Sequence, residues 1–301
     1  MVTVVMTTCK RSVETVTRAV LSVTVQTYKD WELIVIDDSP NTFEYREEVK
    51  KHVLSATQGY QVTYIFNSEN RGACFSRNIG LNLAKGEYIA FLDDDDEWLP
   101  EKLQEQIDAF KKADADTAMI YGPFFRIDEQ TGRKSLVQLK QRSGYIFSEL
   151  LQEGNFIGGM SMPMIKTESV RNTNGFDNDL QSAQDYDLWL RISQKYRIEY
   201  LSSPLVLYYV HKGEQITGNP SKKIQGLERI NEKYRELINS NPELWYKRHM
   251  IIIPYYAANR EIKKAFATWL QGVKKKPIKV RENSIFFLQM IRVAIFGKVC
   301  Y

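Results

Sequence analysis

The chain has 301 residues, of which 43% are hydrophobic and 26% are charged, enough apolar material for a globular fold with a sizeable core. Its three cysteines are too far apart for a disulfide framework or a metal-binding spacing, and no apolar run reaches the roughly 18 residues of a membrane-spanning helix. The net charge of +4 hides an asymmetry: residues 221–301 hold 17 Lys and Arg against 6 Asp and Glu, a balance of +11 that leaves −7 for the first 220 residues.

Strands and helices alternate over the first 112 residues. β-Branched and apolar runs predict strands at 2–8, 31–37, 60–66 and 87–92. Helical spacing predicts helices at 12–26, at 43–55, within 70–86 and at 99–112. Ser12 is the expected N-cap of the first helix and Gly86 the expected C-cap of the third. The alternation indicates a parallel sheet of βα units. The first residues already have the pattern of a strand and lack the features of a signal peptide.

From about residue 120 the pattern is mixed. Apolar runs at 118–128 and 144–151 bracket a polar turn, and a helix is expected toward the end of 174–196. Residues 198–211 are strand-like, and the chain beyond 221 is helical and basic.

Three polar clusters follow predicted strands, namely Thr7–Thr8, Asp37–Asp38 and Asp93–Asp96. In a parallel sheet the functional groups lie just past the carboxyl ends of the strands, so these clusters are expected to share one edge. The clustered carboxylates would repel one another alone but would suit Mn²⁺ or Mg²⁺. The alternative is a solvated acidic loop or a helix N-terminus, which would account for Asp96 and Glu97 but not for Asp93.

Five fragments of the chain resemble one family, the inverting family 2 glycosyltransferases of GT-A fold, and occur in that family's order. "IAFLDDDDEWLPEKL" is similar to the family's FLD-x-DDEW-x-P-x-KL, and "VTVVMTTCKR" to its opening strand and PTYNR loop. "SVTVQTYKDWELIVIDDSP" and "NRGACFSRNIGLNLAKGEYIAFLD" match two further family segments. "GFDNDLQSAQDYDLWLRI" is similar to G-F-D-x-x-L…E-D-Y-D-L-W-L-R, so the resemblance extends over most of residues 2–215.

The resemblance implies an α/β fold of GT-A type, a Rossmann-like nucleotide-binding βα sheet with an appended acceptor-side subregion. The catalytic domain would span 1–220, with a nucleotide-sugar half at 1–100 and an acceptor half at 101–220. Residues 221–301 would form a helical, basic C-terminal extension.

The resemblance also assigns residues to the donor. Asp37 or Asp38 would accept a hydrogen bond from the nucleotide base, and Arg77 would approach the diphosphate. Asp93 and Asp95 would hold the Mn²⁺ or Mg²⁺ ion, with His211 as a further ligand or a contact of the diphosphate. The remaining nucleotide-binding residues implied are Thr8, Arg11 and Asp94.

Asp185 would be the general base that deprotonates the acceptor hydroxyl, so that attack opposite the diphosphate inverts the anomeric carbon. The residues placed near the acceptor are Trp189, Arg191, Gly158 and Gly159.

Each assignment has a structural alternative. Asp37 and Asp38 could be turn residues, Arg77 a surface helix residue and Asp185 a helix N-terminal residue. His211, Trp189 and Arg191 could be purely structural, the last two as a core anchor and a helix-face charge. The chain also departs from the family pattern: Thr7 and Cys9 replace Pro and Tyr, and Gln184 replaces the Glu before Asp185, which removes a like charge beside that carboxylate.

The segment 273–298 joins a lysine cluster to an apolar stretch of about a dozen residues. It would lie at an anionic membrane surface, or instead pack on the catalytic domain or form an oligomer contact.

The sequence therefore predicts a metal-dependent inverting glycosyltransferase (hexosyl or N-acetylhexosaminyl) that uses a nucleoside-diphosphate sugar, by default a UDP-sugar. Its acceptor would be a hydroxyl of a glycan, lipid-linked or glycoprotein molecule in capsule or other envelope polysaccharide synthesis. No nucleic acid partner is expected, and the expected location is cytoplasmic, peripheral on the inner face of the plasma membrane. The alternatives are a nucleotidyl- or phosphotransferase, without a GxxxxGK[ST] loop to support it, and a non-catalytic nucleotide-sugar-binding homologue.

Overall fold

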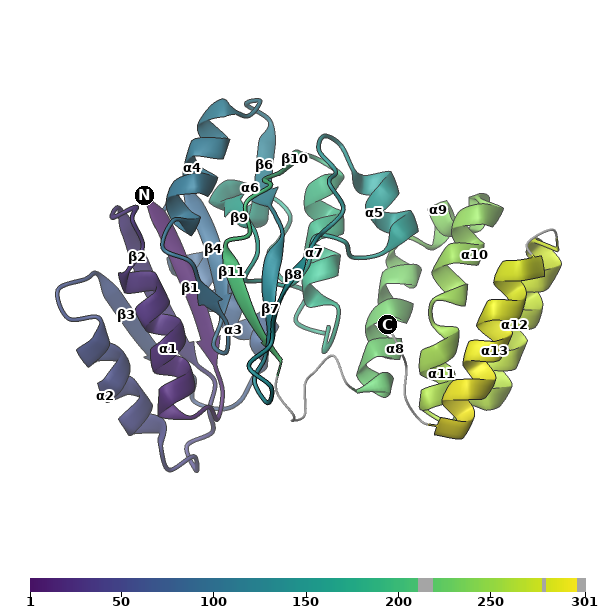
Figure 1. The fold of residues 1–301 in the computed structure, drawn as a ribbon, viewed down its shortest axis with the longest axis horizontal. Coiled ribbons are helices and arrows are strands. Elements are labelled where there is room, and N and C mark those ends of the chain that lie inside the picture. Colours follow the sequence, from purple (N-terminus) through teal and green to yellow (C-terminus); the bar gives the residue numbers. More distant parts are fainter. Residues whose placement is uncertain (211–218, 278–279, 297–301) are drawn as a thin grey trace. The chain divides into compact units, whose positions relative to one another are not determined.

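The computed structural model describes residues 1–210, 219–277 and 280–296 (Figure 1). The chain divides into two compact units. The sheet unit comprises 1–147, 155–178 and 185–212, and the helical unit comprises 148–154, 179–184 and 213–301.

A seven-stranded sheet forms the centre of the sheet unit, in the order β10-β6-β9-β4-β1-β2-β3. Its strands are β1 (Val2–Thr8), β2 (Trp31–Asp37), β3 (Val62–Phe66), β4 (Tyr88–Asp93), β6 (Thr117–Tyr121), β9 (Met164–Lys166) and β10 (Arg197–Tyr200). The prediction of a parallel sheet is confirmed for β1 to β4. The short strand β9, for which the sequence analysis gave no prediction, runs antiparallel between β4 and β6.

The register of β1 brings the polar clusters to one edge. Thr8 pairs with Asp37 of β2, and Thr7 pairs with Asp93 of β4. The carboxyl ends of the three strands therefore finish level with one another.

A second, four-stranded sheet has the order β5-β11-β7-β8. Its strands are β5 (Glu97–Trp98), β7 (Phe124–Asp128), β8 (Lys134–Val137) and β11 (Val206–Val210). The expectation that Asp96 and Glu97 lead straight into a helix is wrong. Glu97 belongs to β5, which pairs antiparallel with β11, and the next helix begins at Lys102.

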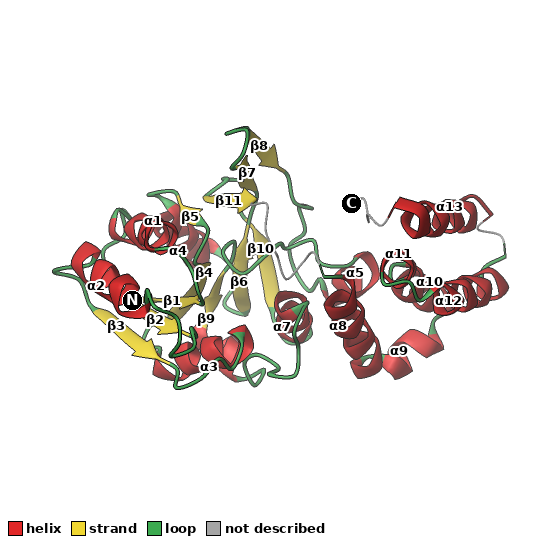
Figure 2. Cartoon of the chain, turned by 90° about the horizontal axis from the view of Figure 1, so that it is seen from below, coloured by secondary structure: helices red, strands yellow, loops and turns green. Residues whose placement is uncertain are grey.

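Helices cover both faces of the seven-stranded sheet (Figure 2). The helices of the sheet unit are α1 (Val13–Thr24), α2 (Arg46–Ala56), α3 (Ala73–Leu83), α4 (Lys102–Lys112), α6 (Thr167–Arg171) and α7 (Gln184–Ser193). Apolar side chains of α1, α2 and α4 pack on one face, where Val4, Leu33 and Leu92 belong to a single buried cluster. The helix α3 lies on the other face, where Gly80 approaches Val5.

The predicted caps have opposite outcomes. Ser12 is the N-cap of α1, and its hydroxyl accepts a hydrogen bond from the Thr15 N–H, as predicted. Gly86 is not the C-cap of α3, because the helix already ends at Leu83 with Ala84 as its cap. Gly86 instead lies where the chain passes close to β1, and a Cβ at this position would be 2.5 Å from the backbone nitrogen of Thr3.

The helical unit confirms the prediction for the chain beyond 221. Besides α5 (Phe147–Glu153), its helices are α8 (Pro220–Lys233), α9 (Arg235–Ser240), α10 (Pro242–Met250), α11 (Ile253–Ala258), α12 (Ile262–Lys275) and α13 (Val280–Phe296). They share a core of their own, which includes Ile224, Tyr246 and Ile253. Within the described ranges, no helix has both the length and the apolar character needed to cross a membrane.

We expect Gly86→Ala to lower the free energy of unfolding by at least about 2 kcal/mol, because the added methyl group meets backbone atoms that cannot move aside. Urea unfolding followed by circular dichroism measures this. Gly159→Ala is the matched control: its Cβ would meet nothing nearer than the Met162 sulfur at 3.9 Å, so its unfolding curve should stay within about 1 kcal/mol of wild type. Equal effects of the two variants would contradict the close approach.

Candidate functional site

The aspartates that follow β4 form a tight, anchored turn. The Asp96 N–H donates to the Asp93 carbonyl at 3.1 Å, which reverses the chain immediately after the strand. The Asp93 N–H donates to the Ser161 hydroxyl at 3.1 Å, and the carbonyl of Ser161 accepts from the indole N–H of Trp98 at 3.0 Å. Ser161 therefore fixes both ends of the turn.

Two arginines face the carboxylates of this turn. Arg11 bridges two adjacent carboxylates: its Nε donates to Asp94 at 2.9 Å and its Nη2 donates to Asp95 at 2.6 Å. Arg77 of α3 donates to Asp93 at 2.9 Å. The structure thus brings together five of the residues predicted for the donor and the metal, because each carboxylate of the 93–95 segment has a guanidinium partner.

Burial raises the pKa of the two less exposed aspartates of the turn. Burial raises the pKa of Asp94 to about 6; Arg11 opposes this rise, and the negative charge of Asp95 adds to it. Burial also raises the pKa of Asp96 well above its ordinary value, with further contributions from Asp93 and Asp95. The Oδ2 atom of Asp96 is buried without a hydrogen-bond partner in the described part of the chain.

The carboxylates that follow β2 differ in what they hold. Asp38 accepts from the Asn67 side chain at 2.6 Å and from the N–H groups of Arg71 and Gly72 at 2.9 and 2.8 Å. It therefore ties β2 to the loop that opens α3. Among the described residues, the Asp37 carboxylate accepts two hydrogen bonds, one from the Tyr64 hydroxyl and one from the Ser39 N–H, both at 2.8 Å.

Asp38 and Asp37 also adjoin the aspartate turn. The Asp38 N–H donates to the carbonyl of Thr8, and the Thr8 hydroxyl lowers the pKa of Asp94 by hydrogen bonding. Since a carboxylate has about four acceptor positions, Asp37 retains more free capacity than Asp38.

Asp185 lies at the start of α7 and is held by a residue that the sequence analysis missed. Its Oδ2 accepts from the Asn155 side chain at 3.0 Å, and Oδ1 accepts from the Tyr186 N–H at 2.7 Å. Asn155 also bonds the Ile157 and Gly158 N–H groups and the Gly158 carbonyl. Asn155 thus fastens a turn to Asp185, and a lone Asn in "GNFIGG" carries no signal for this role.

Of the four residues predicted near the acceptor, Trp189, Gly158 and Gly159 come together, and Trp189 and Arg191 are engaged inside the fold. Trp189 is fully buried, and its indole N–H donates to the Gly158 carbonyl at 3.2 Å. Arg191 pairs with the buried Asp187 at 2.8 Å and donates to the Thr173 carbonyl. Gly158, with φ of 96°, and Gly159 form the turn itself. Trp189 therefore supports this turn from within, whereas Arg191 holds Asp187 and the Thr173 carbonyl.

The fit of a divalent cation rests on the donor set. Asp93 and Asp95 offer partly exposed hard oxygens, with 32% and 21% of their side chains accessible. Mg²⁺ is usually held by one or two carboxylates together with substrate phosphates and water. Among the described residues no three His, Cys, Asp or Glu groups are arranged to hold a metal. Asp93 and Asp95 would supply two ligands, and substrate phosphates and water would have to supply the others. His211 lies outside the described residues.

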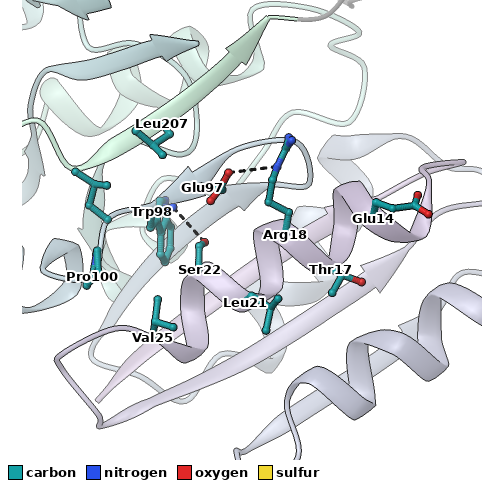
Figure 3. A pocket seen from close by; sticks show the side chains of 11 residues that line it. Glu14, Thr17, Arg18, Leu21, Ser22, Val25, Glu97, Trp98, Pro100 and Leu207 are labelled. Atoms are coloured by element: carbon teal, nitrogen blue, oxygen red, sulfur yellow. Dashed lines mark hydrogen bonds and ion pairs between the residues drawn. The ribbon is translucent and has the colours of Figure 1, made fainter. Parts of the chain in front are cut away.

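Arg18 is a further residue that the sequence did not predict, and it lies on the far side of the turn. A hollow of about 500 Å³ lies between α1 and β5, and Arg18 points across it toward Glu97 (Figure 3). The Nη2 of Arg18 donates to the Asp95 carbonyl at 3.0 Å, so it supports the backbone of the turn. None of the predicted site residues lines this hollow, and it is separate from the carboxylate side of the turn.

Comparison with known proteins agrees with the fragments found in the sequence. The family model described as glycosyl transferase family 2 matches residues 3–168. WcaA of Escherichia coli (strain K12), described as a colanic acid biosynthesis glycosyl transferase, is 32% identical over 225 residues, which cover 73% of this chain and 76% of that protein. An uncharacterised glycosyltransferase of Haemophilus influenzae is 30% identical over 71% of this chain and 70% of its own length.

Two solved structures share the fold. TarS 1-349 of S. aureus, in complex with UDP-GlcNAc, superposes with a TM-score of 0.60 at 15% identity, covering 90% of this chain and 88% of that one. The mannosyltransferase PcManGT from Pyrobaculum calidifontis, in complex with GDP-Man and Mn²⁺, gives 0.58 at 15% identity, covering 99% and 88%. The predicted α/β fold of GT-A type is confirmed.

Asp38→Ala should lower the free energy of unfolding by about 3 kcal/mol, because it leaves one side-chain donor and two backbone donors in a buried position without their acceptor. Asp114→Ala is the control: Asp114 pairs with Arg197 at the surface and is 66% exposed, so its removal should cost less than about 1 kcal/mol. Urea unfolding of both variants measures the difference, and a small loss for Asp38→Ala would contradict its structural role.

Proposed function

The chain belongs to glycosyl transferase family 2, and on that premise we propose that it transfers a sugar from a UDP-sugar to an acceptor hydroxyl with inversion at the anomeric carbon. Membership establishes a glycosyltransferase that uses a nucleotide-sugar donor. The observation that carries the finer proposal is the aspartate turn at the sheet edge, faced by Arg11 and Arg77 and adjoining the Asp37–Asp38 cluster.

Asp37 is the proposed acceptor of a hydrogen bond from the base. It has unused acceptor capacity at the same edge as the aspartate turn, whereas Asp38 already holds the loop that opens α3. Thr8 lines the same position through its pairing with Asp37. The choice of uracil is the family default, and the neighbour that carries UDP-GlcNAc supports it no further than by a shared fold.

Asp93 and Asp95 are the proposed ligands of Mn²⁺ or Mg²⁺. When bound, such an ion neutralises charge on the leaving nucleoside diphosphate. Arg11 and Arg77 would contribute guanidinium groups to the same diphosphate, a task suited to a planar donor with several N–H groups. The mannosyltransferase neighbour that carries GDP-Man and Mn²⁺ is consistent with this arrangement.

Asp185 is the proposed general base. Asn155 orients its carboxylate, and the adjoining turn at Gly158 and Gly159 would form part of the acceptor surface. Asp185 would remove the proton of the acceptor hydroxyl as the oxygen attacks the anomeric carbon from the face opposite the diphosphate. The transition state would have oxocarbenium-ion character, as in other glycosyl chemistry.

The acceptor proposed is a growing glycan, free or lipid-linked, in the synthesis of a surface polysaccharide. The relative described as a colanic acid biosynthesis glycosyl transferase supports this class of product. The sugar transferred would be a hexose or an N-acetylhexosamine.

The helical unit is proposed to bring the enzyme to an anionic membrane surface on the cytoplasmic side. The helix α12 exposes Ile262, Phe266 and Leu270 at a spacing of four residues, and Leu288 of α13 is 63% exposed. The helix α12 thus has exposed apolar side chains in addition to those that pack in the core of the unit. Several lysines lie beside them in the sequence. An apolar stripe bordered by lysines suits an interface with anionic headgroups. Packing of the same residues against a second copy is the competing explanation.

Asp185→Asn should lower the transfer rate by at least about 100-fold, because the amide cannot accept the proton of the acceptor. Product formation with a panel of nucleotide-sugars measures it, and UDP affinity within threefold of wild type is the control for an intact donor site. Asn155→Ala should give a smaller loss, about tenfold, because it frees the carboxylate without removing it. Full activity of Asp185→Asn would exclude it as the base.

A full-length variant carrying Phe266→Glu and Leu288→Glu should lose at least about tenfold in partitioning to anionic phospholipid vesicles, since both side chains are exposed and apolar. Leu136→Glu, at a 48% exposed position of β8, is the matched control and should sediment with vesicles like wild type. Unchanged partitioning of the double variant, or an effect on its oligomeric state alone, would refute the membrane proposal.

A further inference from the structure

Arg11 uses one guanidinium to hold two adjacent carboxylates of different exposure. Asp94 is 6% exposed and accepts from Nε at 2.9 Å. Asp95 has a more accessible side chain and accepts from Nη2 at 2.6 Å. The contact with Asp95 is therefore the one that a ligand entering from solvent can reach.

A metal on Asp95 and the guanidinium of Arg11 compete for the same oxygen. Mg²⁺ or Mn²⁺ binds a carboxylate oxygen at about 2.1 Å, and Nη2 is 2.6 Å from Oδ2 of Asp95, so the two cations would be no farther apart than about 4.7 Å. At this separation a divalent ion repels the guanidinium strongly. Arg77 makes the same kind of contact with Asp93, the other proposed ligand.

A diphosphate gives the displaced guanidinium a new partner. Phosphate oxygens accept paired N–H bonds from arginine, and Arg11 can keep its Nε on buried Asp94 while Nη2 turns away from Asp95. Each anion then has a cationic partner, because the metal would take the place of the arginine on the carboxylate and the arginine would take the place of solvent on the phosphate.

From this geometry we propose that Arg11 couples metal binding to nucleotide binding by exchanging Asp95 for the diphosphate. The inference rests on the proposed function, since it takes Asp95 as a metal ligand. Arg11 holds the affinity of the free protein for metal low, and the nucleoside diphosphate removes this block. Metal and nucleotide therefore bind with positive cooperativity, and the coupling is reciprocal.

Isothermal titration calorimetry of the full chain tests this, with Mn²⁺ titrated in the absence and presence of saturating UDP. Arg11→Gln should bind Mn²⁺ alone about tenfold more tightly than wild type, and its enhancement by UDP should shrink by a similar factor. Arg11→Lys keeps the charge but cannot bridge both carboxylates. Its Mn²⁺ affinity, and the enhancement of that affinity by UDP, should therefore lie between those of wild type and those of Arg11→Gln.

Lys10→Gln is the matched control. Lys10 lies in the same loop and carries the same charge, but it makes no ion pair with a carboxylate among the described residues. Its loss should change Mn²⁺ affinity less than threefold. If Lys10→Gln and Arg11→Gln raised the Mn²⁺ affinity equally, the gain would come from the loss of any nearby positive charge. That result would overturn the exchange.

The remaining outcomes separate the two proposals. Arg11→Gln with unchanged or weaker Mn²⁺ affinity overturns the exchange while leaving the metal-dependent transferase in place, provided that wild type binds Mn²⁺ with UDP. A wild-type chain that binds neither Mn²⁺ nor UDP overturns the proposed donor site itself. If Arg11→Gln does not fold, the Mn²⁺ affinity of Arg11→Lys, measured with and without UDP, tests the exchange in its place.

Discussion

Mutual repulsion of carboxylates at the end of β4 is the constraint on which the site depends. Four aspartates follow one another where the sheet ends, and Asp94 and Asp96 are buried. Without counter-charges so many carboxylates could not remain ionised together. The fold answers this in two ways: arginines from two other segments reach Asp93, Asp94 and Asp95, and burial raises the pKa of Asp96 well above its ordinary value.

The surrounding elements hold this charge in place through backbone donors and buried side chains. Ser161 fixes Asp93, and Arg18 supports the Asp95 carbonyl from behind. Asp38 fastens the neighbouring loop so that α3 can present Arg77. These hydrogen bonds hold the turn on the side of the sheet, while ion pairs of the partly exposed Asp93 and Asp95 hold it on the other side. The exchange proposed for Asp95 would alter one of these ion pairs.

Much of the site could be predicted from the sequence because strand ends and family motifs are local features. The level ends of β1, β2 and β4 follow from alternating strands and helices, and they gather the polar clusters as expected. Gly86 and Glu97 were misjudged because their roles depend on distant partners: the close approach of β1 in one case and pairing with β11 in the other. Asn155 and Ser161 left no signal, since a single polar side chain acquires such a role only through its position in the fold.

The central claim is that the aspartate turn receives a divalent metal together with a nucleoside diphosphate. The melting temperature of the full chain with UDP, GDP or CDP, each with and without Mn²⁺, tests it most directly, because a ligand that binds only the folded state raises that temperature. The account predicts that one nucleoside diphosphate, by default UDP, stabilises the protein and does so only when Mn²⁺ is present. Absence of stabilisation by all three, with and without the metal, would contradict it.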